Sequence, residues 1–263
     1  MRRKLDGARV LLTGASSGIG RALARELAEQ RADLLITARR GDRLETLATD
    51  LRSQGLRVSV VVGDIVLSTT RDELVRTAVS EFDGLDILIN NSGVGTYGAF
   101  STSDENRLRR LMEVNFFAPA ELIRATLPLL KDGRDPLIVN VGSVLGHFAV
   151  PNKSEYCASK FAMHGFSDSL RCELVSKNIG LLLVSPSTTK SEFFDSLIDP
   201  QVAPTVSPFQ MTPEAVASRI VSAMRSRRRE IVLSVGGKML VAVDRLVPWL
   251  TNWIFARFGG RKF

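Results

Sequence analysis

The sequence predicts a doubly wound α/β domain, with a parallel sheet of about seven strands and helices on both faces. Two observations carry this prediction: short apolar runs alternate with helix-length stretches along the chain, and a glycine-rich turn follows the first run. Strands joined in this way lie parallel and are buried on both faces, so they are apolar throughout. The 263 residues, 44% of them apolar, suffice for one domain with a sizeable core.

Strands are expected where apolar, β-branched runs of about five residues occur. In chain order the expected strands are 9–13, 33–38, 57–62, 86–90, 137–141, 180–184 and 230–234. The expected helices run from the glycine-rich turn to about 30, and over 42–54, 69–82, 104–130, 155–176 and 213–228. Ligands of such a sheet bind beyond the carboxyl ends of the strands, so polar residues there are site candidates.

The turn Gly14-Ala15-Ser16-Ser17-Gly18-Ile19-Gly20 follows the first expected strand directly. Gly14 permits the tight turn, Gly18 lets the backbone approach a pyrophosphate at a helix N-terminus, and Gly20 lets the helix pack closely on the strand. The turn alone is also compatible with an ordinary strand-to-helix connection. Its spacing, Gly-x-x-x-Gly-x-Gly, differs from the commoner dinucleotide fingerprint.

The second expected strand ends in Thr37-Ala38-Arg39-Arg40, where an NAD enzyme usually has a carboxylate for the ribose hydroxyl. A guanidinium here would instead contact a 2′-phosphate, an interaction worth about 1.5–3 kcal/mol. The pattern favours NADP(H) as cofactor, with Arg39 on the phosphate. The alternative is that both arginines are simply solvated.

Tyr156 and Lys160 are four residues apart in an expected helix, so both side chains leave one face. Moving a tyrosine pKa toward neutrality by ~3 units requires ~4 kcal/mol, more than one exposed lysine supplies. A second positive charge, such as an oxidised nicotinamide, is therefore expected nearby. Ser143, just beyond the run 137–141, would donate a hydrogen bond to a carbonyl being reduced. Otherwise this is a surface tyrosine with a lysine one turn away.

Asp64 and the set Asn90-Asn91-Ser92-Gly93 follow two further strand ends, and Asn115 lies within the expected helix 104–130. As ordinary structure, Asp64 would cap a helix and the asparagines would close a turn. Combined in order with the motifs Thr13-Gly14-x-x-x-Gly18-Ile19-Gly20, Ser143 and Tyr156-x-x-x-Lys160, these residues resemble the short-chain dehydrogenase/reductase family over nearly the whole chain.

The resemblance implies a Rossmann-like domain that transfers a hydride between NADP(H) and a carbonyl or alcohol, with Tyr156 as general acid/base. It further implies that Lys160 lowers the tyrosine pKa and binds ribose, that Ser143 orients the substrate oxygen, and that Asn115 holds a water relaying protons to Lys160. The implied cofactor contacts are Gly14, Ser16, Ser17, Gly18, Ile19, Gly20, Arg39, Asp64 (on the adenine), Ile65, Asn91, Tyr156, Lys160 and Thr189. Family members usually pair through the helices containing Asn115 and Tyr156, which implies a homodimer or homotetramer.

Two positions depart from the family pattern: Ser92 replaces an alanine, and Pro186-Ser187 replaces Pro-Gly. Without the glycine, the loop beside the nicotinamide is less free to adopt positive φ. Thr189 and Ser191 could still hydrogen-bond the carboxamide.

The segment 187–211 is long for a connection and is expected to form a substrate lid within a catalytic domain 1–236. Apolar side chains here and after Ser143 predict a pocket for an apolar, lipid- or steroid-like carbonyl compound, or alternatively a simple seal. These side chains are Phe193, Phe194, Leu197, Ile198, Val202, Phe209, Val144, Leu145, Phe148 and Val150.

The C-terminal tail segment, 237–263, is basic and apolar. From Arg225 onward nine Lys/Arg face two acidic residues, a net of +7 that equals the charge of the whole chain. Apolar residues at helical spacing and a kink at Pro248 predict a helical segment whose residues 238–262 lie on an anionic membrane surface without crossing it. Packing on the lid or on a second subunit is the alternative. Nucleic-acid binding would explain the charge but not the Ser-Tyr-Lys set, so no nucleic acid is expected.

Cys157 and Cys172 lie in one expected helix, ~22 Å apart, so they cannot pair within the chain. Two histidines without nearby cysteines predict no metal site. The first residues form no apolar leader, so a reducing, cytoplasmic location is expected. The rival function is an NADP-binding sensor or scaffold without turnover, which would not need Ser143, Tyr156 or Lys160.

Overall fold

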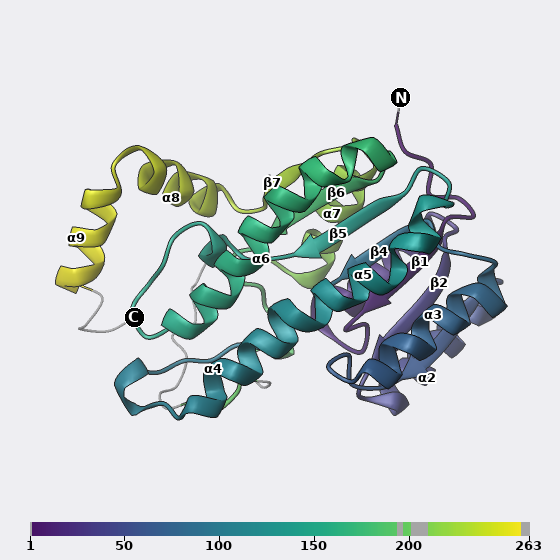
Figure 1. Ribbon diagram of the computed structural model, residues 1–263, viewed down its shortest axis with the longest axis horizontal. Coiled ribbons are helices and arrows are strands. Elements are labelled where there is room, and N and C mark those ends of the chain that lie inside the picture. The colour runs from purple at the N-terminus through teal and green to yellow at the C-terminus, as the bar shows by residue number, and fades with distance from the viewer. Residues whose placement is uncertain (1, 194–196, 201–209, 259–263) are drawn as a thin grey trace.

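A seven-stranded parallel sheet, in the order β3-β2-β1-β4-β5-β6-β7, forms the centre of the computed structural model (Figure 1). The structure describes residues 2–193, 197–200 and 210–258. The strands are β1 Arg9–Thr13, β2 Asp33–Ala38, β3 Val58–Val62, β4 Ile87–Asn90, β5 Leu137–Val141, β6 Gly180–Ser185 and β7 Glu230–Val232. The predicted doubly wound fold is confirmed, and the strand order reverses between β1 and β4, where such sheets bind ligands.

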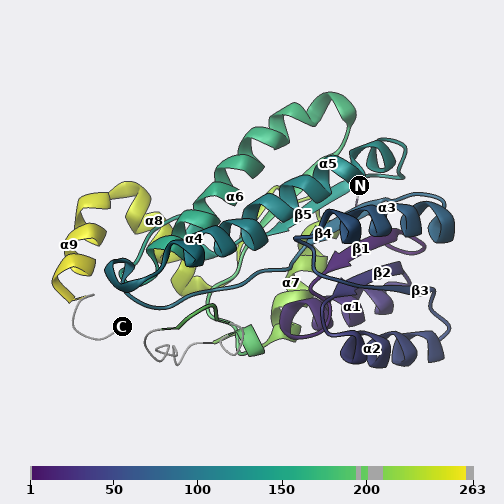
Figure 2. The same cartoon turned by 60° about the horizontal axis from the view of Figure 1, so that its bottom comes forward.

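Helices cover both faces of the sheet (Figure 2). They are α1 Gly18–Glu29, α2 Gly41–Ser53, α3 Ser68–Phe82, α4 Glu105–Met112, α5 Ala118–Lys131, α6 Ser154–Glu173, α7 Pro213–Arg225, α8 Val235–Leu246 and α9 Pro248–Phe258. Helices α1, α2 and α7 share one apolar core with the sheet, and α3, α5 and α6 share the other.

Alternation along the strands divides the core in two, because successive side chains of a strand point to opposite faces. In β1, Val10 and Leu12 pack toward α1 and α7, whereas Leu11 packs toward α3 and α5. The continuous apolar runs seen in the sequence are therefore central strands buried on both sides.

Several element ends differ from the sequence prediction. Helix α7 ends at Arg225 rather than 228, because Arg227 turns into the left-handed region with φ 54°. Strand β7 ends at Val232 rather than 234, because the Ser234 hydroxyl caps α8 by accepting from the backbone N–H of Gly237 at 2.9 Å. Helix α6 ends at Glu173, and a single 3₁₀ turn follows.

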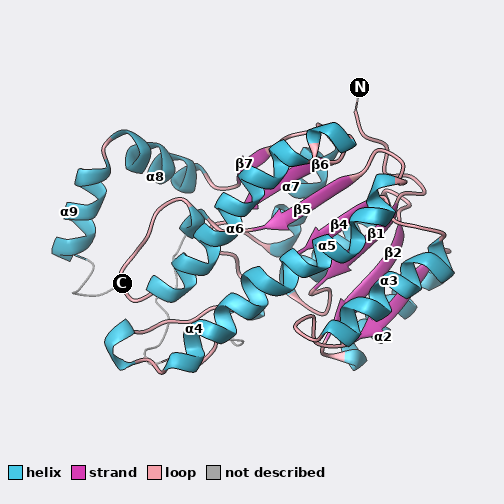
Figure 3. Ribbon diagram, in the orientation of Figure 1, coloured by secondary structure: helices cyan, strands magenta, loops and turns pink. Residues whose placement is uncertain are grey.

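The tail forms two helices, α8 and α9, instead of one kinked helix, and it extends beyond the β7 edge of the sheet (Figures 1 and 3). Pro248 occupies the first position of α9, where its missing N–H costs nothing. Helix α8 begins at Val235, so the boundary expected after residue 236 falls inside it. Among the described residues, no helix is both long and apolar enough to cross a membrane.

Candidate active site

A cavity of about 1610 Å³ opens beyond the carboxyl ends of the strands. Ligand pockets usually measure about 300–1,000 Å³, so this one has room for more than a single small molecule. Every site residue predicted from the sequence lines it except Asn115. The residues brought together are Gly14, Ser16, Ser17, Gly18, Ile19, Gly20, Arg39, Asp64, Ile65, Asn91, Ser143, Tyr156, Lys160 and Thr189.

The glycine-rich turn between β1 and α1 allows no side chain at its crowded points. Gly14 and Gly18 have φ values of +69° and +49°, and a Cβ on Gly20 would overlap the carbonyl oxygen of Gly14. Ser17 precedes α1 without a capping hydrogen bond from its side chain. The first N–H groups of α1 therefore border the cavity without competition from that hydroxyl.

Asn91 fixes this turn against the end of β4. Its Nδ2 donates to the carbonyl oxygens of Thr13 at 3.0 Å and Gly14 at 3.2 Å. In return, the Thr13 hydroxyl accepts from the backbone N–H groups of Asn91 and Ser92, both at 3.0 Å. The Asn91 amide thus holds the turn in place, and its predicted contact with the cofactor stays a prediction.

Three arginines surround the end of β2. Arg39 is exposed at the cavity edge and has no hydrogen bond or ion pair with the described part of the chain. Arg40 donates to the hydroxyl of Ser17 at 2.6 Å and to Glu192 Oε2 at 2.8 Å. Arg43 reaches the same carboxylate oxygen at 2.5 Å. Nothing in the sequence pattern predicts Glu192 here, because it comes from the distant segment 187–211.

The loops after β3 and β6 hold their predicted site residues through local hydrogen bonds. Asp64 Oδ1 accepts from the backbone N–H of Val66 at 3.1 Å, which closes a turn and leaves its side chain at the cavity. Thr189 donates to the Ser187 carbonyl oxygen at 3.2 Å and forms a bridge with Met211. Ser187 has no positive φ, so the serine causes no backbone strain at this position.

Tyr156 and Lys160 project from α6 into the cavity, with Ser143 opposite at the end of β5. Burial raises the pKa of Tyr156 to about 12, although a hydrogen bond with Ser143 opposes the shift. Burial lowers the pKa of Lys160 to about 8. The Lys160 ammonium donates to the Val141 carbonyl oxygen at 3.3 Å and lies 5.8 Å from the centre of the Tyr156 ring.

Burial in the protein therefore favours the neutral forms of both Tyr156 and Lys160. The predicted lowering of the Tyr156 pKa by Lys160 remains a prediction, and a further positive charge would have to contribute to it.

Asn115 lies in a π-helical turn, Glu113–Phe117, that interrupts the helix predicted over 104–130. Its buried amide accepts from the backbone N–H of Val94, donates to the Val94 carbonyl, both at 2.9 Å, and donates to the Ser159 hydroxyl at 3.0 Å. A Cβ on Gly93 would lie 3.3 Å from Asn115 Oδ1 and 3.6 Å from Lys160 Nζ. Asn115 therefore approaches Lys160 across Gly93, and the predicted water relay is a matter for experiment.

A buried ion pair supports the start of α6. Arg107, from α4, donates through Nε to Glu155 Oε2 at 2.7 Å, and both side chains are almost fully buried. Arg107 also donates to the Ala99 carbonyl at 3.2 Å. Because Glu155 precedes Tyr156, this pair fixes the helix end that presents the tyrosine.

Apolar side chains from three segments form the other end of the cavity. Val144, Leu145, Phe148 and Val150 line it as predicted, and Phe193 contributes from the segment 187–211. The tail contributes Leu240 and Phe255, whose ring stacks on Phe148 with centroids 6.2 Å apart. In the lid, Ile198 donates its N–H to the Gly95 carbonyl at 2.8 Å, while the predicted lid residues Phe194, Val202 and Phe209 lie outside the described residues.

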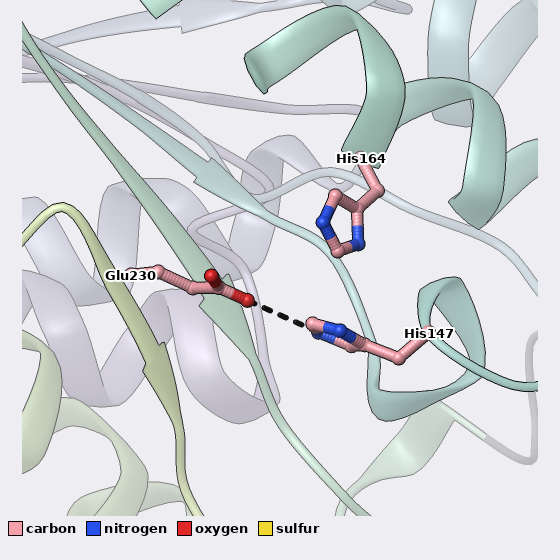
Figure 4. Close-up of side chains that lie close together, drawn as sticks. All are labelled: His147, His164 and Glu230. Atoms are coloured by element: carbon pink, nitrogen blue, oxygen red, sulfur yellow. Dashed lines mark ion pairs between the residues drawn. The ribbon is translucent and has the colours of Figure 1, made fainter. Parts of the chain in front are cut away.

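The side chains of His147, His164 and Glu230 lie close together (Figure 4). His147 Nε2 is 2.9 Å from the Ser185 hydroxyl and 3.4 Å from Glu230, and Arg245 of α8 lies 3.4 Å from Nδ1. Burial, His164 and Arg245 together lower the pKa of His147 to about 4. Neutral His147 therefore connects β6, β7 and the tail.

Comparisons with known proteins agree with the fold. The family model described as short chain dehydrogenase matches residues 8–201. A Drosophila melanogaster dehydrogenase/reductase SDR family protein 7-like is 31% identical over 97% of this chain and 82% of its own length. A solved Burkholderia phymatum short-chain dehydrogenase/reductase, in complex with NAD, has a TM-score of 0.87 at 24% identity and covers 95% of this chain and 96% of its own.

A Burkholderia cenocepacia short-chain dehydrogenase, in complex with NADP, has a TM-score of 0.79 at 26% identity and covers 90% of this chain and 100% of its own. Fold, site and matches together define an oxidoreductase acting on CH–OH or C=O groups. The chain belongs to the short-chain dehydrogenase/reductase family.

Proposed function

We propose that the protein transfers a hydride between NADP(H) and an apolar carbonyl or alcohol, with Tyr156 as general acid/base. The observation that carries this proposal is one cavity that joins the glycine-rich turn to Ser143, Tyr156 and Lys160. A sensor or scaffold that binds NADP without turnover would need only the first half of that cavity.

The residues at the turn fit a dinucleotide. Gly14, Gly18 and Gly20 leave the backbone bare where α1 begins, so its N–H groups would hold the pyrophosphate. Asp64 and Ile65 would contact the adenine, Lys160 the ribose, and Thr189 the carboxamide. When bound, the nicotinamide supplies or accepts the hydride at C4.

The proton chemistry belongs to the chain itself. The Ser143 oxygen accepts from the Leu145 N–H at 3.1 Å, and its hydroxyl, which hydrogen-bonds with Tyr156, would donate to the substrate oxygen once that oxygen lies between the two side chains. Tyr156, with its pKa raised to about 12, holds its proton at neutral pH and can pass it to that oxygen during reduction. Lys160, with a pKa of about 8, is mostly charged at pH 7 and stabilises the resulting phenolate.

Arginine recognition supports NADP(H) over NAD(H). The two solved neighbours are complexes with NAD and with NADP, so they leave the choice of cofactor open. At the end of β2 this chain has Arg39, Arg40 and Arg43. Among the described residues, the one carboxylate bonded to them is Glu192, from the distant segment 187–211. Arg39, without a partner in the described structure, is best placed to take a 2′-phosphate, as predicted from the sequence.

Replacing Arg39 with Asp should therefore weaken NADPH binding by about 10- to 100-fold and improve NADH binding, since a carboxylate repels phosphate but accepts from ribose hydroxyls. Titration of protein fluorescence with each cofactor measures this. Arg76→Asp, which changes an exposed arginine on α3, is the matched control. Equal affinity of the wild-type protein for both cofactors would remove the basis of the assignment.

The decisive test is NADPH oxidation with a panel of ketosteroids, retinoids, keto-lipids and simple ketones. On any accepted substrate, Tyr156→Phe should lower kcat by about 10²- to 10⁴-fold with little change in the NADPH dissociation constant, because only the transferable proton is lost. Lys160→Ala should impair both binding and turnover. Retention of most of the kcat by Tyr156→Phe would refute the role of Tyr156, and tight NADPH binding without turnover on any ketone would favour the sensor.

Two further proposals concern partners. Phe117 and Phe161, 48% and 43% exposed, lie on the helical layer that carries Asn115 and Tyr156, which supports homodimer or homotetramer formation through that layer. In the tail, an exposed apolar face with basic neighbours supports peripheral contact with an anionic membrane. The same face could instead cover a second subunit.

A further inference from the structure

A cation without an anion lies in the apolar end of the cavity. Lys153 immediately precedes α6, one turn before Tyr156, and lines the cavity. No carboxylate forms an ion pair with it among the described residues, and its ammonium instead lies 5.2 Å from the centre of the Tyr97 ring. Burial lowers the pKa of Lys153, which reflects how little the protein compensates its charge.

Tyr97 adds a second unsatisfied donor at the same place. Its side chain is buried, at 4% exposure, and lines the cavity. Its hydroxyl is buried and finds no hydrogen-bond partner in the described structure. Buried polar groups normally have partners, so a hydroxyl left alone beside a ligand cavity indicates an acceptor brought by the ligand.

The surroundings restrict what that acceptor can be. The adjoining wall is apolar, with Val144, Phe148 and Val150. One ammonium and one hydroxyl match the charge and the acceptor oxygens of a carboxylate, whereas a phosphate carries more charge than this wall offsets.

We propose that Lys153 and Tyr97 form a subsite for a carboxylate on the substrate, so that the preferred substrates are apolar keto acids. This inference rests on the proposed function, because it places the reducible carbonyl at Tyr156. Lys153 precedes Tyr156 by three residues, about 4.5 Å at the helical rise per residue, so a carboxylate bound by Lys153 lies close to the carbonyl at Tyr156. The Lys153 side chain binds the substrate carboxylate, and Tyr156 transfers the proton to the carbonyl oxygen.

The test compares the reduction of 4-acetylbenzoate and of its methyl ester, with NADPH as the hydride donor. The two ketones differ by one negative charge. We expect wild-type kcat/KM to be at least tenfold higher for the acid. Lys153→Met should lower the acid-to-ester ratio by 10- to 100-fold, and Tyr97→Phe should lower it several-fold. Lys153→Arg should retain most of the preference. Lys177→Met, an exposed lysine beyond the far end of α6, should keep the wild-type ratio.

A wild-type preference for the ester, or a ratio unchanged by Lys153→Met, would overturn the subsite. Calorimetry of 4-acetylbenzoate binding to the NADPH-loaded protein tests the carboxylate subsite separately from hydride transfer. Binding that depends on Lys153 but leads to no turnover would support the subsite and contradict the proposed function. If the acid does not bind to the wild-type protein, the subsite is wrong. If Lys153→Met does not fold, the acid-to-ester ratios of Tyr97→Phe and Lys153→Arg still test the subsite. An unchanged ratio in Tyr97→Phe, or a lost preference in Lys153→Arg, would contradict it.

Discussion

The two ends of the cavity are held together in different ways. At the cofactor end, bare glycines and main-chain hydrogen bonds set the geometry, and the Asn91 amide ties the turn to β4. At the apolar end and in the helix start that supports it, side chains from distant segments hold one another, as in the stack of Phe148 on Phe255 and the ion pair of Arg107 with Glu155. The first end depends on short motifs, whereas the second depends on pairs far apart in sequence.

This difference implies different responses to substitution. A backbone-built site tolerates changes around it as long as its glycines remain. A site built from side-chain pairs fails when one partner is removed, because the other is then left buried without compensation.

The largest effect is expected at the Arg107–Glu155 pair. Arg107→Met should lower the free energy of unfolding by about 3–5 kcal/mol, because it leaves the Glu155 carboxylate buried and unpaired. Urea denaturation measures the change. The double variant with Glu155→Met should recover part of the loss, since no charge remains buried.

The control is Arg109→Met, which breaks the exposed pair that Arg109 forms with Glu105, one turn before it on the same helix α4. That change should cost less than about 1 kcal/mol. Equal losses in the two arginine variants would mean that burial does not distinguish the pairs, and the comparison between the cavity ends would lose its strongest case.

A smaller effect, dependent on pH, is expected at His147. Its pKa is about 4 in the folded protein against 6.5 in the unfolded chain, so the unfolded chain takes up the proton first as pH falls. Stability contributed by neutral His147 is complete above pH 6.5 and is lost between pH 6.5 and 4, to a total of up to about 3 kcal/mol. His164, Arg245, Glu230 and Asp168 are the charged or titratable groups that face it or act on it.

Thermal unfolding at pH 7.5 and pH 4.5 tests this. His147→Gln keeps hydrogen-bonding groups but cannot titrate, so its stability should fall less between the two pH values than that of the wild-type protein. Parallel losses in the two proteins would show that other groups cause the acid sensitivity.

The sequence predicts the local motifs of this molecule better than the contacts between residues far apart in the chain. Gly14 to Gly20, and Tyr156 with Lys160, could be placed because each set is local and its spacing fixes its geometry. Arg107 and Glu155 are 48 residues apart, and nothing near either predicts the other. The π-helical turn at Asn115 has no sequence signature comparable to a cap or a proline. The tail could be predicted as helical and amphipathic, but its packing against the pocket depends on Phe148 and the buried Val241.

The smallest effect per residue is expected at the tail, where the structure separates two faces. Val241 and Phe255 pack toward the pocket, whereas Leu246 and Trp249 are 81% and 70% exposed. Lys238 of α8 and Arg257 of α9 are exposed as well and have no ion pair in the described structure. Each basic residue near anionic lipid adds about 1 kcal/mol, or roughly fivefold in affinity, so the face should bind anionic vesicles at low salt.

Truncating the tail would also remove Phe255 from the pocket, so substitutions give the cleaner test. Sedimentation with anionic vesicles should recover the wild-type protein with lipid, and Leu246→Ser with Trp249→Ser should release it. Lys238→Gln with Arg257→Gln should weaken binding to anionic vesicles by about 25-fold and leave any binding to neutral vesicles unchanged. The control pair Lys131→Gln and Lys177→Gln removes the same charge elsewhere on the surface. If the wild-type protein stays in the supernatant with anionic vesicles, and the apolar substitutions instead reduce its mass in light scattering, the face covers a second subunit rather than lipid.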